Sequence, residues 1–319
     1  MSSGKRYFFA DLAKVIGAFL VILGHTYIHG NVRNLIYAFH MPLFFFIGGL
    51  FFKPAGIVRE LTKDFWRLII PAVFFTILLL VERCLVFGSP FWPSIQSVFT
   101  DVFQGKPMHV NVQIWFLIVL ALIRLIAAVW FHNRLVAIGI VLAGLLSFRF
   151  NLFYFAQVEI CLPFFAAGYL CKDFILKRAE APKDKRILLP VLAVTAVASF
   201  ILTHLNGAVD IIGLILGSLP KGLNIVVFYL NAFLGISALL AFCLLFDGPS
   251  RVVDQVSPAL LTIVGVQEAF LCLVIHFWRY NLPHYITFPV SICILILCVL
   301  ADKVLTCYVP ILVGKKEKN

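Results

Sequence analysis

Charged residues are scarce in this chain. Asp, Glu, Lys and Arg together make up 13% of its 319 residues, whereas apolar residues make up 62%. Soluble globular domains average about 25% charged and about 45–50% apolar residues, so this composition excludes a soluble enzyme and a disordered chain. Long apolar runs recur from one end of the chain to the other, and the mean hydropathy is +1.02. This distribution excludes a single-anchor protein and predicts a polytopic helical membrane protein.

Paired cysteine motifs and glycine-rich phosphate loops are also missing. None of the eight cysteines belongs to a C-x-x-C pair, and the glycines do not form a Rossmann or P-loop pattern. Seven cysteines lie inside or at the ends of apolar runs: Cys161, Cys171, Cys243, Cys272, Cys293, Cys298 and Cys307. We therefore expect buried free thiols, and neither disulfides nor a metal site.

Ten apolar runs are present instead, separated by polar residues, prolines or glycines. They are residues 8–28, 35–52, 65–81, 113–131, 134–148, 152–171, 187–204, 224–246, 258–280 and 285–309. At about 20 residues per span, ten spans with short loops use nearly the whole chain. We therefore expect a single all-α membrane domain over residues 1–319, a bundle of about ten transmembrane helices, with no appended soluble domain.

The first run resembles a signal peptide, because Lys5 and Arg6 precede it. Asp11 and Lys14 interrupt the run, however, and no small-residue cleavage site follows it. We therefore expect the segment to remain in the protein as its first span.

Basic residues are divided unevenly between the loops. If both termini are cytoplasmic, the cytoplasmic segments hold 16 of the 26 Lys and Arg residues and the opposite segments hold six. Because Lys and Arg collect in cytoplasmic loops, this asymmetry predicts an even number of spans with both termini in the cytoplasm. The net charge of +11 then reflects membrane topology, so no nucleic-acid partner is expected.

Two of the predicted non-cytoplasmic segments are long and only mildly polar. They are residues 82–112, which include Phe91, Trp92 and two prolines, and residues 205–223. Segments of this kind lie at the membrane interface or fold back over a cavity.

The first span carries most of the ionisable residues found inside the apolar runs. Lys14 and His25 are separated by 11 residue steps, which at about 100° per residue places them within about 20° of each other around a helix. They are separated by roughly 16 Å along the axis. Asp11, Lys14, His25 and His29 therefore form a polar stripe that predicts one wall of a pore or cleft crossing the membrane. The alternative is that Asp11 pairs with Lys14 and His25 is a structural interfacial histidine.

The second and third runs add two further candidates. His40 comes shortly before Pro42, which frees backbone groups and lets a helix bend around a cavity, although an interfacial histidine is often structural. Arg67 follows Lys63 by about one helical turn and precedes Pro71. A guanidinium there suits a phosphate ligand, but on its own it is better explained as a positive-inside anchor.

Together these motifs resemble one family of membrane enzymes. The run DLAK at residues 11–14 with Gly24-His25, the run FHMPLFF at 39–45 and the run RLIIP at 67–71 occur in the order seen in the acyltransferase 3 family of integral-membrane O-acyltransferases. The fucose 4-O-acetylase-like branch is the most similar. Trp115-Phe116-Leu117 and the run PFFAAGY at 163–169 add weaker support. Many members have a histidine in the ninth span, where this chain offers Gln267 and Glu268, so that histidine's role is not transferred.

The resemblance implies transfer of an acyl group, usually acetyl, from cytoplasmic acetyl-CoA to a sugar hydroxyl of an envelope glycan or its lipid-linked precursor. Acetyl-CoA would act as the donor substrate, with no permanently bound cofactor, in the inner membrane of a bacterium. A neutral imidazole suits the base that accepts the hydroxyl proton, and His25 is the candidate. The other assignments are Asp11 and Lys14 as catalytic partners, Arg67 and Lys63 as donor-binding residues, and His40, Glu82 and Trp115 on the acceptor side.

Several alternatives stay open at this point. Acetyl transfer can be direct or can pass through a covalent intermediate, with His25 as the nucleophile. A polar stripe and bent helices also suit a secondary transporter or flippase. Transporters built from repeats show matching broken helices in their two halves, however, whereas the polar residues here are concentrated in the first three spans. The third alternative is a non-catalytic membrane scaffold, in which the polar stripe on the first span would have no function.

Overall fold

The computed structural model describes residues 6–26, 30–106, 113–143, 154–181, 184–211, 215, 217–278 and 283–315. Over these ranges the chain is helical and contains no strand, which confirms the all-α class. The elements are α1 (Phe8–His25), α2 (Asn31–Leu50), α3 (Ile57–Asp64), η1 (Phe65–Ile69), α4 (Ile70–Phe87), α5 (Phe91–Gln104), α6 (Trp115–Trp130), α7 (Arg134–Ala143), α8 (Phe155–Glu180), α9 (Lys185–Asn206), α10 (Lys221–Leu244), α11 (Arg251–Val256), η2 (Ser257–Ala259), α12 (Leu260–Trp278), α13 (His284–Tyr308) and η3 (Pro310–Val313).

Six helices in the described part of the chain are long and apolar enough to cross a membrane, as expected for a multi-pass membrane protein. They are α1, the run Ile57–Phe87, α9, α10, the run Arg251–Val274 and the run Tyr285–Tyr308. α6 and α7 are shorter apolar helices. Each of the ten apolar runs in the sequence overlaps a separate helix of the described part of the chain, the other two being α2 and α8.

The third predicted span, residues 65–81, is wrong in its bounds because the helix continues at both ends. α3, η1 and α4 form one helical run that ends at Gly88, where a left-handed φ of 65° caps the helix. Glu82 and Arg83 therefore belong to this helix and not to the following loop. η1 is a π-helical turn in the middle of the run, and such turns often occur at functional sites.

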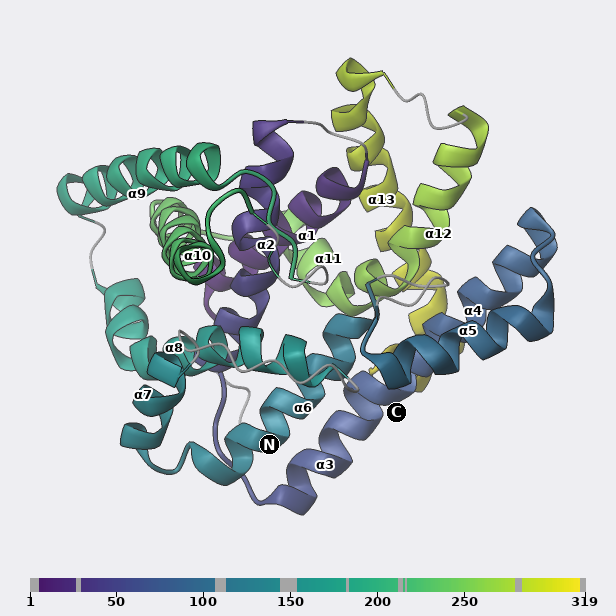
Figure 1. Cartoon of the computed structure of the whole chain (residues 1–319), viewed down its shortest axis with the longest axis horizontal. Coiled ribbons are helices and arrows are strands. Elements are labelled where there is room, and N and C mark those ends of the chain that lie inside the picture. The colour runs from purple at the N-terminus through teal and green to yellow at the C-terminus, as the bar shows by residue number, and fades with distance from the viewer. Residues whose placement is uncertain are drawn as a thin grey trace.

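α1 lies at the centre of the bundle (Figure 1). It packs against α2, α10, α12 and α13, and most of its residues are buried. Small side chains at Ala10, Ala13 and Gly17 let the neighbouring helices approach closely. A polar side chain on this helix therefore faces other helices or an internal space.

α2 and α8 cross with their backbones in contact. A Cβ atom at Gly49 would collide with the Phe165 carbonyl group, and one at Gly168 would collide with the Phe46 carbonyl group. Only glycine permits this approach, and the crossing holds α2 against the middle of the bundle.

We expect Gly168→Ala to lower the free energy of unfolding by about 1–3 kcal/mol, because the added methyl group overfills the crossing. Thermal unfolding of the detergent-solubilised protein measures the effect. Gly139→Ala is the matched control, since a Cβ at this position in α7 would have no neighbour within 4 Å. Equal unfolding midpoints for the two variants would contradict the close crossing.

Segments predicted to be cytoplasmic meet at one end of the bundle. The Tyr7 hydroxyl donates a hydrogen bond to Glu180 at 2.8 Å, and the Arg6 guanidinium pairs with Asp254 at 2.8 Å. These contacts join the N-terminal segment to the end of α8 and to α11. We call this the basic end of the bundle.

The two long segments predicted to lie at the interface or to fold back over a cavity pack onto the bundle where they are described. α5 lies along α4, and the following Gly105 carbonyl accepts a hydrogen bond from Gln157 of α8 at 2.8 Å. After α9 the chain turns inward, so that Val209 and Ile211 are buried. Residues 107–112, 212–214 and 216 lie outside the described part of these segments.

Candidate active site

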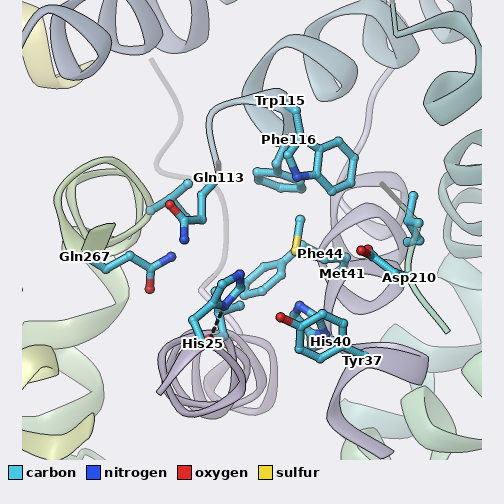
Figure 2. A pocket seen from close by; sticks show the side chains of 13 residues that line it. His25, Tyr37, His40, Met41, Phe44, Gln113, Trp115, Phe116, Asp210 and Gln267 are labelled. Carbon is cyan, nitrogen blue, oxygen red and sulfur yellow. Dashed lines mark hydrogen bonds between the residues drawn. The ribbon is translucent and has the colours of Figure 1, made fainter. Parts of the chain in front are cut away.

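A small internal chamber lies between α1, α2, the start of α6, the loop after α9, and α12 (Figure 2). Its volume is about 40 Å³, which is room for on the order of three water molecules. We call it the inner chamber. The labelled residues that line it are His25, Tyr37, His40, Met41, Phe44, Gln113, Trp115, Phe116, Asp210 and Gln267.

His25 stands at the last turn of α1 with its ring toward the inner chamber. Its Nδ1 lies 2.7 Å from the Val21 carbonyl oxygen. A carbonyl group only accepts hydrogen bonds, so Nδ1 carries a proton, and in the neutral tautomer with that proton the lone pair is on Nε2. Figure 2 shows the second ring nitrogen turned toward the middle of the chamber. The arrangement presents a base to whatever occupies the chamber.

His40 repeats this geometry on α2. Its Nδ1 lies 2.8 Å from the Ile36 carbonyl oxygen, and the side chain is buried. The ring of Tyr37 lies between the two histidines, 5.8 Å from His25 and 5.1 Å from His40 between ring centroids. Both imidazoles are therefore held in one tautomer by their own helices and in one orientation by a shared aromatic ring.

Asp210 reaches the inner chamber from the loop between α9 and α10. Asn206 donates a hydrogen bond to Asn224 at 2.8 Å, and Asn224 donates one to the Ile215 carbonyl at 3.1 Å. The Ser218 amide also donates to the Asn206 carbonyl at 2.7 Å. These bonds close the loop over the bundle and bring a carboxylate to the side opposite His25.

Two glutamines line the inner chamber near His25. Gln113 donates a hydrogen bond from Nε2 to Glu268 at 2.7 Å, and Arg83 pairs with the same carboxylate at 3.7 Å. Gln267 is fully buried, and neither its amide nitrogen nor its amide oxygen bonds to any described residue. Glu82 interacts electrostatically with Arg83 and Glu268 and does not line the inner chamber.

A second cavity of about 350 Å³ lies toward the basic end and contains Lys14 and Arg124. We call it the Lys14 chamber. It shares three lining residues with the inner chamber, namely Phe44, Phe116 and Val264. The rings of Phe44 and Phe116 meet edge to face with centroids 5.8 Å apart. An apolar partition one side chain thick therefore separates Lys14 from His25.

A third cavity, of about 1110 Å³, opens beside α3 and η1 and is lined by four basic residues. We call it the basic pocket. Arg59, Lys63 and Arg67 are spaced four residues apart along one helical face, and Lys315 joins them from the C-terminal segment. The spacing of Lys63 and Arg67 in the sequence thus marks a real cluster, which Arg59 and Lys315 extend.

The basic pocket and the Lys14 chamber are neighbours. Gly314 lines the first and Leu261 lines the second. A Cβ atom at Gly314 would lie 2.7 Å from the Leu261 side chain and 3.0 Å from the Arg67 carbonyl oxygen. One layer of side chains therefore divides the two cavities.

The stripe predicted on α1 is divided among three environments. Asp11 is buried at the basic end, where it pairs with Arg6 and accepts hydrogen bonds from Ser257 at 2.8 Å and Lys14 at 3.3 Å. It lines none of the three cavities. Lys14 lines the middle cavity and His25 the innermost one. His29 lies outside the described residues.

Of the three residues that the sequence analysis assigned to the acceptor side, Trp115 and His40 line the inner chamber and Glu82 does not. Sequence reasoning did not single out Tyr37, Gln113 or Asp210. Only Asp210 had an indirect signal, since residues 205–223 were expected to lie at the interface or to fold back over a cavity.

The described residues contain no cluster of three His, Cys, Asp or Glu side chains with the geometry of a metal site. The eight cysteines are free thiols. Three of them, Cys161, Cys243 and Cys298, are buried. The expectation that the thiols are buried is therefore wrong for the exposed Cys171, Cys293 and Cys307, because one side of an outer membrane helix faces away from the bundle.

Comparison with known proteins gives one match. The model of a family described as an acyltransferase domain, acyltransferase 3, matches residues 7–311. The searches of curated proteins and of solved structures found no match. The matched range contains every cavity residue named above except Gly314 and Lys315. With nearly its whole length covered, this chain belongs to the acyltransferase 3 family and is a membrane acyltransferase.

Proposed function

We propose that this acyltransferase moves an acetyl group from cytoplasmic acetyl-CoA to a sugar hydroxyl of a cell-envelope glycan or its lipid-linked precursor. The observation that carries the proposal is the orientation of His25, whose Nδ1 is bound to a backbone carbonyl and whose Nε2 faces the inner chamber. From the inner chamber toward the basic end, the Lys14 chamber comes next and the basic pocket follows. Family membership favours an acyltransferase over a transporter or a scaffold.

The proposed topology has ten spans with both termini in the cytoplasm of a bacterial cell, in the inner membrane. The four helices beyond the six long apolar ones, α2, α6, α7 and α8, supply the remaining spans. In this orientation the basic pocket opens toward the compartment that contains acetyl-CoA. Assignment to the fucose 4-O-acetylase-like branch rests on the sequence motifs.

Donor binding is assigned to the basic pocket. Phosphate groups of CoA suit Arg67 and Lys63, with Arg59 one turn further along, because charge-assisted hydrogen bonds to phosphate are among the strongest in proteins. The pantetheine arm then passes the layer at Leu261 and enters the Lys14 chamber. This path delivers the thioester to the partition in front of His25.

The chemistry follows from the tautomer of His25. The acceptor hydroxyl gives its proton to Nε2 while its oxygen bonds to the thioester carbonyl carbon. Collapse of the tetrahedral intermediate breaks the C–S bond, and the leaving thiolate takes the proton back from the imidazolium. His40 and Trp115 line the acceptor side of the chamber, together with Asp210, whose carboxylate suits sugar hydroxyl groups. We assign no substrate contact to Glu82, and Asp11 is proposed to position Lys14.

The same lone pair on His25 is the nucleophile in a two-step route. Incubating the purified protein with labelled acetyl-CoA without acceptor separates the two routes. Direct transfer leaves the protein unlabelled, whereas a covalent intermediate places label on His25.

The small inner chamber favours a two-carbon acyl group. We expect Phe44→Ala, which opens the partition between the two chambers, to raise the rate of butyryl transfer relative to acetyl transfer by about tenfold, because one or two methylenes are worth roughly 1–3 kcal/mol in an apolar site. The two rates are measured with acetyl-CoA and butyryl-CoA. Phe19→Ala is the matched control, since Phe19 contacts Phe288 and lines neither chamber. An unchanged ratio in Phe44→Ala would contradict the proposed path.

The proposed acceptor is tested in cells. Mass analysis of envelope polysaccharide from cells with and without the gene should show ester-linked acetyl groups on sugars only when the gene is present. Identical glycans in the two strains would count against an envelope acceptor.

A further inference from the structure

Among the described residues that line the inner chamber, Gln267 is distinguished by an amide whose nitrogen and oxygen both lack a hydrogen-bond partner. It is fully buried on α12, and neither end of its amide bonds to any described residue. Leaving a buried amide without partners costs roughly 1–3 kcal/mol for each unsatisfied group. A well-packed apolar side chain of similar size would avoid this cost. The chamber therefore keeps a polar group whose partner arrives with the substrate.

The position of Gln267 is set by the helices around it. At Gly265, two residues earlier, α12 approaches α4 so closely that a Cβ would collide with Phe75. The next residue, Glu268, holds Gln113 on one side and Arg83 on the other. These contacts anchor α12 on both sides of Gln267. Figure 2 shows its amide directed into the same space as His25 and Gln113.

Gln113, the two histidines and Asp210 are poor donors toward a developing negative charge. One of the two amide N–H groups of Gln113 is used by Glu268, and its free Oε1 is an acceptor. In their neutral tautomers, His25 and His40 present unprotonated Nε2 atoms, because each Nδ1–H is bound to a backbone carbonyl. The carboxylate of Asp210 would repel an anion. Gln267 thus has an amide group next to His25 whose N–H donors are both unused. Trp115 and Tyr37 also line the chamber and carry one donor each.

We propose that Gln267 binds the oxyanion of the tetrahedral intermediate. This inference rests on the acyl transfer proposed above. As the acceptor oxygen bonds to the carbonyl carbon and its proton passes to His25, the π electrons of the carbonyl move onto its oxygen. The Gln267 N–H donates to that oxygen. When the C=O bond re-forms, the C–S bond breaks and CoA leaves as the thiol with the proton from His25.

Gln267→Met tests the proposal, because methionine has a similar volume and no donor. Removing one oxyanion donor lowers kcat by about 10²–10³-fold in enzymes of this chemistry. We expect that loss with acetyl-CoA, with KM for acetyl-CoA changed less than about threefold. We also expect an equal or higher unfolding temperature, since an unpartnered buried amide is removed. If Gln267 had a purely structural role, the replacement would instead lower the unfolding temperature.

Gln157→Met is the matched control, since Gln157 is equally buried but bonds to the Gly105 carbonyl outside the chamber. It should lose stability and keep its kcat per folded molecule. Turnover of Gln267→Met within about threefold of the wild-type value would overturn the oxyanion assignment.

A second measurement does not depend on turnover. Acetonyl-CoA carries a ketone in place of the thioester carbonyl and cannot transfer its acyl group. With ¹³C at the ketone carbon, binding to the wild-type protein should move the resonance downfield, and Gln267→Met should abolish the shift while binding is retained. A shift that persists in the variant would overturn the inference. If the wild-type protein polarises the ketone but acetylates no envelope glycan, the proposed acceptor fails and the assignment of Gln267 stands. If the wild-type protein does not bind the analogue, both proposals fail.

Discussion

Replacing His25 with glutamine is expected to lower acetyl transfer by about 10²–10⁴-fold, the range that general acid–base catalysis contributes. Glutamine keeps a polar side chain of similar length at the end of α1. It cannot accept the hydroxyl proton or return it to the leaving thiolate. The side chain of His25 bonds to a carbonyl of its own helix and contacts one ring of a neighbouring helix, Tyr37, so its replacement removes little of the packing of α1. The amount of protein in the membrane should therefore be unchanged.

The rate is measured as release of CoA thiol by the purified protein in the presence of glycan acceptor. His204→Gln is the control, since His204 lies exposed near the end of α9, where its ring contacts Asn31. It should keep wild-type activity. Wild-type activity in His25→Gln would refute the assignment of His25 as the base.

Arg67→Ala is expected to raise KM for acetyl-CoA about tenfold or more, because a hydrogen bond to a charged group is worth about 1.5–3 kcal/mol. Arg67 lines the basic pocket and not the inner chamber, so kcat at saturating donor should stay close to the wild-type value. Measuring the rate over a range of acetyl-CoA concentrations separates the two parameters. A loss of kcat with unchanged KM would place Arg67 outside the donor site.

Arg186→Ala is the matched control for this experiment. Arg186 is an exposed arginine in the first turn of α9 and lines neither the basic pocket nor the Lys14 chamber. Its replacement removes the same charge from the protein. An equal rise of KM in both variants would mean that the binding of acetyl-CoA depends on the net charge of the protein and not on the basic pocket.

The sequence was sufficient to predict the helices and part of the site. Each apolar run forms a helix, because a run long enough to cross a membrane must satisfy its backbone hydrogen bonds internally. Lys63 and Arg67 lie in one pocket, as their spacing of one turn predicts. His25 and Lys14 both face internal cavities, because helical periodicity identifies the face of α1 on which they lie.

Helical periodicity does not determine what each part of a face will contact. Asp11 lies near the same face as Lys14, yet at the basic end it pairs with Arg6 and accepts a hydrogen bond from Ser257. Glu82 was placed in a loop, whereas α4 extends to Gly88 and includes it. The contacts of Asp11 and Glu82 depend on which helices pack beside them, and a local sequence pattern does not specify the packing partners of a helix.

Tyr37, Gln113 and Asp210 have no spacing signature of their own. They come from α2, from the segment just before α6 and from the loop after α9, and they meet only in the folded bundle. Gln267 was noted in the sequence only as a departure from the family pattern. Its burial without a partner among the described residues becomes visible once α12 is placed beside α1.

Labelled acetyl-CoA supplied to the purified protein in proteoliposomes, with envelope glycan as acceptor, tests the central claim most directly. Label recovered as an ester on a sugar hydroxyl is the predicted result, and His25→Gln protein at the same density should give none. Release of labelled acetate without any labelled glycan, or equal labelling by the two proteins, would contradict acyl transfer to a sugar at His25.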